Sequence, residues 1–295
     1  MRARMKRRQL YRRVTILAAV AGIVIVLVVG FYFALKESTA NDYRIGKPVT
    51  AADLSALKQF SLPPYGSIPS ATQLSYVQNY NGTAWSGKPR VVFVGADFCM
   101  YCAAERWPIL LSLLRFGNFT GLEYMASSVT DGDYATFTFN NLTYTSKYFI
   151  FQPFEAEARN GSSLQTVPSN YSTIWQSYGT GFPFLDFGNR YIIPASLIDP
   201  SGLFDGKNWA QLENDIANGT ATGTNIKGAA NLITALICKL TGNQPGSVCG
   251  QSPITSLTLQ PLAYSTNLSG GVVTLSLVQT SPSVPGAVFP RRGSA

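Results

Sequence analysis

The sequence contains no histidine, and this absence removes several kinds of active site. Without an imidazole there is no Ser-His or Cys-His hydrolase arrangement and no histidine-liganded metal site. Charged residues are also scarce, at 13% of 295 residues, and no glycine-rich phosphate loop is present. Hydrophobic residues make up 46%, which is enough for a sizeable core and argues against a disordered chain. We therefore expect a folded protein that binds no metal and no cofactor.

Acidic residues are absent from residues 1–13, which hold seven of the 23 basic residues. The rest of the chain has 16 basic and 15 acidic residues, a net charge of +1. A nearly neutral body has no electrostatic footprint for nucleic acid, so we expect no nucleic-acid partner. The basic cluster is better explained by membrane topology, because an apolar segment follows it directly.

This apolar segment runs from Val14 to Leu35 without a charge. As a helix it would span roughly 33 Å, enough to cross a bilayer. The preceding positive charges favour a cytoplasmic N-terminus. A cleaved signal peptide is the alternative, with Ser38-Thr39-Ala40 as the cleavage site, but its apolar region is usually only about 7–15 residues long. We expect a single-pass protein of the cell membrane, anchored in the lipid bilayer, with its main domain extracytoplasmic.

Two features of the exported part agree with this location. All four cysteines lie there, in a compartment where disulfides persist. The sequence also has seven Asn-X-Ser/Thr sequons, more than its composition leads one to expect, and these are candidate glycosylation sites. They are Asn81, Asn118, Asn141, Asn160, Asn170, Asn218 and Asn267.

Hydrophobic patterns predict an α/β domain, because strands and helices alternate along the chain. The layout has a basic segment at 1–13, an anchor at 14–35, a stalk and N-terminal extension at 36–84, the domain at 85–250 and a partly flexible extension at 251–295. The predicted elements are strands at 91–98 and 122–129, a hairpin at 135–152 turning at Asn140-Asn141, two strands at 182–199, helices at 102–116, 164–179 and 225–240, a further helix that begins with residues 208–212, and edge strands from residue 252.

The strongest motif is Cys99-Met100-Tyr101-Cys102, set between the strand at 91–98 and the following helix. At a helix N-terminus, free N–H groups and the helix dipole stabilise a thiolate on the first sulfur. Cys99 is therefore the candidate nucleophile, and Cys102 is the candidate resolving cysteine. Two alternatives remain: a structural disulfide, and half of a zinc site that the other two cysteines would complete.

The order of active-site strand VVFVGADF, motif CMYC and proline strand FPFLDF resembles the thioredoxin fold. The phrase GADFCMYCAAERWPILLSLLRFG is similar to a family of membrane-anchored archaeal and bacterial thioredoxin-like proteins without an established function. The resemblance covers about residues 85–250. It implies that Cys99 is the nucleophile, that Cys102 resolves the mixed disulfide and that Pro183 is a cis-proline facing the sulfurs.

The sequence departs from thioredoxin at two places. The buried acid that thioredoxin keeps six residues before its first cysteine is Phe93 here, and Met100-Tyr101 replaces a Gly-Pro dipeptide. The nearest acids are Asp97, expected at the strand edge, and Glu105. Glu105 is a candidate proton acceptor; the alternatives are a solvated helix residue or a partner for Arg106.

The second cysteine pair, Cys238 and Cys249, encloses a short loop with glycine and proline turn signals. We expect a structural disulfide there, while a second redox pair relaying electrons to the first is the alternative. Trp107 and Phe116 have helical spacing and are expected in the core.

These patterns predict a thiol-disulfide oxidoreductase acting on the thiols and disulfides of exported proteins, with a membrane redox partner as a further candidate. The main alternative is a non-catalytic thioredoxin-fold binding or scaffold module in which CMYC is a closed disulfide. A redox sensor reporting through the anchor is a weaker third hypothesis, because the cytoplasmic segment is short.

Overall fold

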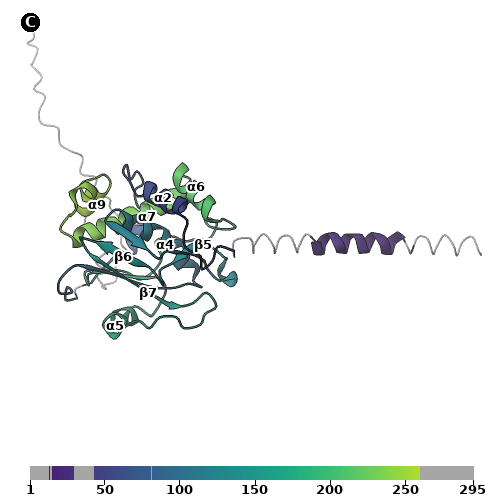
Figure 1. Cartoon of the computed structure of the whole chain (residues 1–295), viewed down its shortest axis with the longest axis horizontal. Helices are drawn as coiled ribbons and strands as arrows, with labels where there is room; N and C mark the ends of the chain where they lie inside the picture. The colour runs from purple at the N-terminus through teal and green to yellow at the C-terminus, as the bar shows by residue number, and fades with distance from the viewer. Residues whose placement is uncertain (1–12, 14, 30–42, 81, 260–295) are drawn as a thin grey trace, which may run out of the picture. The chain divides into compact units, whose positions relative to one another are not determined.

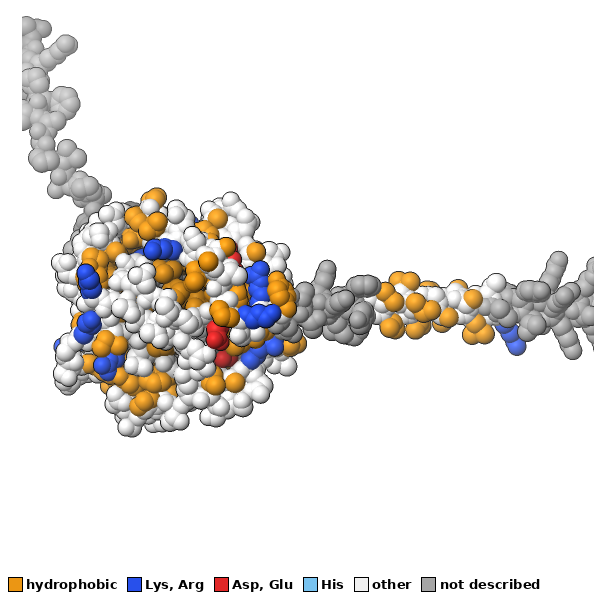
Figure 2. Space-filling model, viewed as in Figure 1, with side chains coloured by type: hydrophobic (Ala, Val, Ile, Leu, Met, Phe, Trp, Pro, Cys, Tyr) orange, Lys and Arg blue, Asp and Glu red, His pale blue; other side chains and the backbone are white. Residues whose placement is uncertain are grey.

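The computed structural model describes residues 13, 15–29, 43–80 and 82–259 (Figure 1). Residues 15–29 are helical, and their apolar side chains are exposed along the segment (Figure 2). No helix in these described ranges is both long enough and apolar enough to cross a membrane. Residues 14 and 30–35 of the predicted anchor lie outside the described residues.

A mixed five-stranded sheet forms the centre of the domain, in the order β1-β9-β8-β2-β7. Strand β2 is parallel to β7 and antiparallel to β8. The strands are β1 (Gln78–Asn79), β2 (Arg90–Ala96), β7 (Ile150–Glu157), β8 (Phe184–Phe187) and β9 (Tyr191–Ile193). The predicted mixed α/β class is therefore confirmed.

Helices cover both faces of this sheet (Figure 1). Val91 and Phe93 of β2 belong to the large core that includes α4 and α7. Val92 and Val94 belong to a second core with Tyr171 of α5. Because successive side chains of a strand point to opposite faces, the continuous apolar run of β2 fits a strand buried on both sides. The helices are α2 (Ala51–Phe60), α3 (Ala71–Ser75), α4 (Met100–Leu114), α5 (Ser169–Ser177), α6 (Trp209–Asn218), α7 (Ala221–Leu240), α8 (Gly246–Cys249) and α9 (Ile254–Leu259).

The predicted hairpin at 135–152 is wrong in its pairing. Two strands do form, but β5 pairs with β4 and β6 pairs with β3, each antiparallel. The chain reverses before β5, where Gly132 has φ of 87° and Asp133 has φ of 50°. Asn140-Asn141 is therefore a bend between β5 and β6, which pair with the consecutive strands β4 and β3. The four strands are β3 (Gly117–Thr120), β4 (Glu123–Ala126), β5 (Ala135–Thr138) and β6 (Thr143–Ser146).

The second strand of the expected order is also different. Strand β4 lies in its own two-stranded sheet, and the parallel neighbour of β2 is β7. Residues 117–146 thus lie in the sequence between helix α4 and strand β7, the parallel neighbour of β2. Its register is decided by these partners, which lie outside the reach of local sequence patterns.

The packed core extends beyond the predicted domain boundaries at both ends. Strand β1 pairs with β9 in the central sheet, and Leu57 of α2 is fully buried. At the other end, residues 254–259 form helix α9, so the edge strand expected from residue 252 is wrong in this part. Ile254 and Leu257 of α9 are buried at the spacing of one helix face. Residues 260–295 lie outside the described residues.

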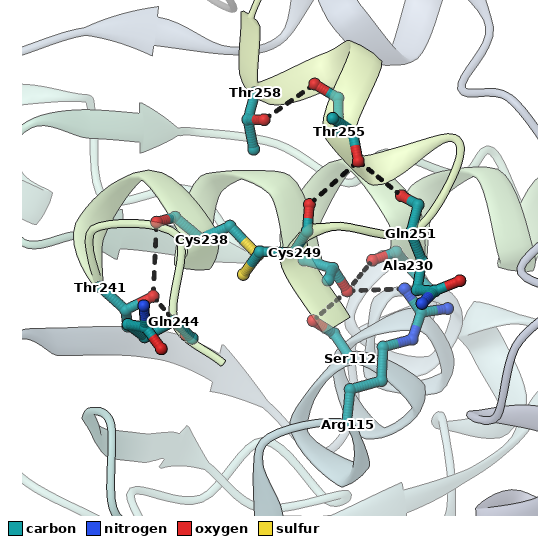
Figure 3. The surroundings of a disulfide bond; sticks show 11 residues. Ser112, Arg115, Ala230, Cys238, Thr241, Gln244, Cys249, Gln251, Thr255 and Thr258 are labelled. Atoms are coloured by element: carbon teal, nitrogen blue, oxygen red, sulfur yellow. Dashed lines mark hydrogen bonds between the residues drawn. A yellow bond between two sulfur atoms is a disulfide. The ribbon is translucent and has the colours of Figure 1, made fainter. Parts of the chain in front are cut away.

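The predicted disulfide between Cys238 and Cys249 is present, with Cα atoms 5.7 Å apart (Figure 3). It joins the end of α7 to α8. Thr241 Oγ1 donates to the carbonyl oxygens of Cys238 (3.3 Å) and Gln244 (2.7 Å). These hydrogen bonds hold the turn between α7 and α8. Both cysteines are buried in the main core.

Candidate functional site

Cys99 occupies the N-cap of α4, immediately beyond the carboxyl end of β2. Its backbone is extended, with φ of −74° and ψ of 125°, so its side chain turns back over the first helical turn. The backbone N–H of Cys102 donates to Cys99 Sγ at 3.2 Å. A sulfur here therefore takes the place of the oxygen that usually caps a helix.

The two thiols are free and differ in access to solvent. Cys99 is 6% exposed and Cys102 is fully buried. Tyr101 between them is 44% exposed, so the bulky dipeptide points outward rather than covering the site. Cys99 is the sulfur that a reactant can approach.

The pKa values of the two thiols also differ. The hydrogen bond from the Cys102 side chain is the largest influence and lowers the pKa of Cys99, with the N–H groups of the helix start contributing. Burial raises the pKa of Cys102 well above its ordinary value. Cys99 is therefore the more acidic thiol of the pair and Cys102 the less acidic one, which is the order that a nucleophile with a resolving partner needs.

The Phe182–Pro183 peptide bond is cis, as the resemblance to thioredoxin implies. Pro183 leads into β8, which runs antiparallel beside β2, so the loop before it lies across from Cys99. The Cys99 thiol donates to the carbonyl oxygen of Phe182 at 3.9 Å. The structure therefore brings together Cys99, Cys102 and the cis-proline loop from segments about 80 residues apart.

Aromatic side chains pack around Cys99. Phe98 meets Phe182 edge to face at 6.2 Å, and Trp175 stacks on Phe182 at 5.4 Å. Beside them is a pocket of about 480 Å³ with Phe98 in its wall. Val129, which lines this pocket, is 67% exposed.

A buried ion cluster lies behind the cysteines. Arg106 donates to Glu155 from Nε (3.0 Å) and Nη2 (2.6 Å), and Nη2 also reaches Asp97 Oδ1 at 3.5 Å. Arg106 and Glu155 are fully buried, and Asp97 nearly so. The space is so tight that a Cβ on Gly95 would overlap the Phe93 ring and lie 3.3 Å from Glu155 Oε2.

One arginine facing two carboxylates sets the charges of this cluster. Burial acts to lower the pKa of Arg106, but Glu155 and Asp97 outweigh it and raise that pKa. Burial, with the Glu155 carboxylate, raises the pKa of Asp97 to about 7. The arginine also acts to lower the pKa of both Cys99 and Cys102, so the cluster is electrostatically connected to the thiols.

The sequence reasoning missed Glu155 and read Arg106 only as a partner for Glu105. The available signal was the presence of charged residues on two largely apolar elements, Glu105 and Arg106 in α4 and Glu155 and Glu157 in β7, since buried charges require partners. Asp97 was expected at the strand edge, whereas it is buried against Arg106.

Glu105 is fully buried, so the solvated alternative is wrong. Its Oε2 accepts from the Leu197 N–H at 2.7 Å and from Ser196 Oγ at 3.1 Å, and Arg106 bonds elsewhere. Oε1 is buried without a hydrogen-bond partner in the described part of the chain. Burial raises the pKa of Glu105 to about 7. Glu105 therefore fixes the loop at 196–198 to α4.

Five of the seven sequon asparagines are described, and all are exposed: Asn118, Asn141, Asn160, Asn170 and Asn218. Asn160 Oδ1 accepts from the Ser162 hydroxyl of its own sequon at 2.7 Å. Asn81 and Asn267 lie outside the described residues. Trp107 and Phe116 are buried in the core as predicted. Within the described residues, no group of three or more Cys, Asp and Glu side chains is placed to hold a metal ion.

Comparison with known proteins gives one finding. Residues 73–239 match the sequence model of a family described as a domain of unknown function (DUF929). This region includes the Cys-X-X-Cys motif, the buried ion cluster and the cis-proline strand. No curated protein and no solved structure matches the chain.

Proposed function

Because the chain belongs to the DUF929 family, which carries no assigned activity, we propose its function from the site: it is a membrane-anchored, extracytoplasmic thiol-disulfide oxidoreductase acting on exported proteins. The observation that carries this proposal is the position of Cys99. It caps α4, accepts the Cys102 N–H at 3.2 Å and keeps 6% of its surface exposed, whereas the thiol one turn behind it is fully buried.

The chemistry follows from this asymmetry. The Cys99 thiolate attacks one sulfur of a substrate disulfide, which forms a mixed disulfide and releases the other substrate sulfur as a thiolate. Cys102 then loses its proton and attacks Cys99 Sγ, which closes the Cys99–Cys102 disulfide and releases the second substrate thiol. Two electrons and the one proton of Cys102 pass to the substrate, whose remaining thiolate takes a second proton from water, and the reverse sequence oxidises a dithiol.

A thioredoxin-like fold is part of the proposal, and the strand arrangement supports it. The cysteine strand β2 lies between a parallel strand, β7, and the antiparallel proline strand, β8, with β9 following. Helix α4 follows strand β2 in the chain, and helices α6 and α7 follow strand β9. In this scheme the segment 117–146 is an insertion between the first helix and the second parallel strand.

The substrate is an extended segment of polypeptide that carries a cysteine. The pocket lined by Phe98, the residue before Cys99, has apolar and polar wall residues, and the rings of Phe182 and Trp175 supply further apolar surface. Aromatic surface of this kind binds many sequences, which suits an enzyme that meets varied exported proteins.

The proposed location rests on the sequence. Seven basic residues precede the apolar segment 14–35, a pattern typical of an anchor with its N-terminus in the cytoplasm. The exposed sequons are compatible with an extracytoplasmic domain.

Trapping tests the proposal directly. In the full chain, Cys102→Ser should accumulate a mixed disulfide with exported proteins, visible as a reducible high-mass adduct at Cys99. Cys99→Ser should abolish both the adduct and disulfide exchange. The control is the double variant Cys238→Ser/Cys249→Ser, which leaves Cys99 and Cys102 in place.

The second candidate function is a binding module with a closed Cys99–Cys102 staple, favoured by the low exposure of both sulfurs. The reduction potential of the pair separates the two. A value between about −120 and −270 mV indicates exchange chemistry, whereas a value below about −300 mV indicates a structural disulfide. The latter result, together with no trapped adduct, would exclude the enzyme.

A further inference from the structure

A second pocket lies at the end of β2 opposite the cysteines. It has a volume of about 290 Å³, several times the roughly 30 Å³ that one water molecule occupies in the liquid. Its wall consists of Ala84, Trp85, Gly87, Pro89, Arg90, Gly188, Arg190, Lys239 and Leu240. Since β2 begins at Arg90 and ends just before the active-site turn, its seven residues separate the two sites by roughly 20 Å.

The charge of this wall has one sign. Arg90, Arg190 and Lys239 are cationic, and none of the nine lining residues is acidic. They come from three separate elements: the start of β2, the turn after β8 and the end of α7. Three cations around one concave volume repel each other and create a positive potential that an anion would neutralise.

The wall also holds unused hydrogen-bond donors. Arg90 Nε and Trp85 Nε1 are both buried, and neither has a hydrogen-bond partner among the described residues. A buried donor without an acceptor destabilises the folded state, because it has lost its hydrogen bonds to water. Two residues of this wall therefore carry donor groups that no acceptor of the described chain satisfies.

The arginine that begins β2 is held in a fixed position. Its guanidinium lies 5.2 Å from the Trp85 ring and 5.9 Å from the Tyr171 ring, and Arg90 Nη1 donates to the Tyr171 hydroxyl. Trp85 and Tyr171 stack with centroids 4.6 Å apart. A planar guanidinium already oriented by aromatic rings loses little freedom when it binds an oxyanion.

We propose that this pocket binds a phosphate- or sulfate-type oxyanion, with the guanidinium groups of Arg90 and Arg190 as its main ligands. Its volume leaves room for part of the group to which the oxyanion is attached. The oxyanion is either free in solution or carried by a lipid headgroup. This role is separate from thiol exchange and goes beyond it.

Calorimetric titration of the purified full chain with inorganic phosphate at low ionic strength tests the proposal, with the variants Arg190→Gln and Lys58→Gln. Arg190 is exposed, so its substitution spares the core, and Lys58 is an exposed cation on α2 that serves as the matched control. We expect saturable binding that weakens about tenfold in Arg190→Gln, since one charge-assisted hydrogen bond is lost, and stays unchanged in Lys58→Gln. Exchange activity should be the same in all three proteins.

A second arm identifies the source of the oxyanion. The same three proteins are mixed with vesicles of phosphatidylcholine, with and without phosphatidylglycerol. Binding of the anionic vesicles that falls in Arg190→Gln but not in Lys58→Gln supports a headgroup, and phosphate binding without this difference supports a free ion. The proposal is overturned if neither arm shows a loss specific to Arg190, or if both variants weaken binding equally.

Discussion

At the scale of single residues, the reactivity of the site depends on how differently two neighbouring thiols are treated. Cys99 is capped onto the start of a helix and receives hydrogen bonds, whereas Cys102 is one turn along and has no access to water. The same helix that offers N–H groups to the first sulfur buries the second. The asymmetry is therefore a consequence of where α4 begins.

Removing the Cys102 thiol should raise the pKa of Cys99. Its hydrogen bond is the largest influence that lowers this pKa, so Cys102→Ala loses it, while Cys102→Ser keeps a donor in the same place. The pH dependence of Cys99 alkylation by iodoacetamide, read by mass spectrometry, checks this. We expect the midpoint to move up in Cys102→Ala and to move less in Cys102→Ser; identical profiles would contradict the explanation.

The buried pair of Arg106 and Glu155 should be essential for stability. Glu155→Gln leaves a buried arginine without its main counter-charge, and breaking such a pair costs about 3–5 kcal/mol. Urea unfolding measures this difference. Glu157→Gln, two residues further on the same strand and partly exposed, is the control and should change stability by less than about 0.5 kcal/mol. Equal effects of the two substitutions would show that the ion pair has no special role.

At the scale of elements, the cysteine motif is presented by a strand that is buried on both faces. Val91 and Phe93 contact one helical layer, and Val92 and Val94 contact the other. This double packing fixes the end of β2, and with it the first turn of α4. The cis-proline loop is fixed in the same way because β8 pairs directly with β2.

The Cys238–Cys249 disulfide should stabilise the domain without taking part in exchange. It joins α7 to α8 over a separation of 11 residues, and closing a loop of about this size contributes about 3 kcal/mol. The double variant Cys238→Ser/Cys249→Ser should lose about this free energy of unfolding in a urea titration while it retains disulfide exchange. Loss of exchange in a variant that is still folded would favour the electron relay instead.

At the scale of the whole molecule, three buried carboxyl groups make stability depend on pH. Burial raises the pKa values of Glu105, Asp97 and Asp186 to about 7, compared with about 4 in an unfolded chain. Between these values the folded protein keeps protons that the unfolded chain has released. The free energy of unfolding should therefore be highest below about pH 4 to 5, as far as these groups are concerned, and should fall as the pH rises to about 7.

Glu105→Gln isolates one of these contributions. The amide keeps the shape of the side chain but has no proton to lose, so the decrease in stability between pH 5 and pH 7.5 should be smaller than in the unsubstituted protein. Urea unfolding at the two pH values measures the slope. An unchanged slope would mean that Glu105 is ionised in the folded protein throughout this range.

The features that depend on local order could be predicted from the amino-acid sequence alone. The buried strand before Cys99, the helix after Cys102, the two strands around Gly188-Asn189 and the short Cys238–Cys249 loop all appear where their patterns placed them. Each is decided by neighbours along the chain: apolar runs, helix starts and turn residues. The cis bond before Pro183 was implied only by the resemblance to thioredoxin, which rests on the order of these elements.

Only the tertiary structure decided which segments meet. The strands at 135–138 and 143–146 pair with earlier strands rather than with each other, and Glu155 reaches Arg106 across 49 positions of sequence. The oxyanion pocket likewise combines cations from three distant elements. Pairing and burial depend on free energies summed over the whole core, and a local pattern contains only the contribution of its own residues.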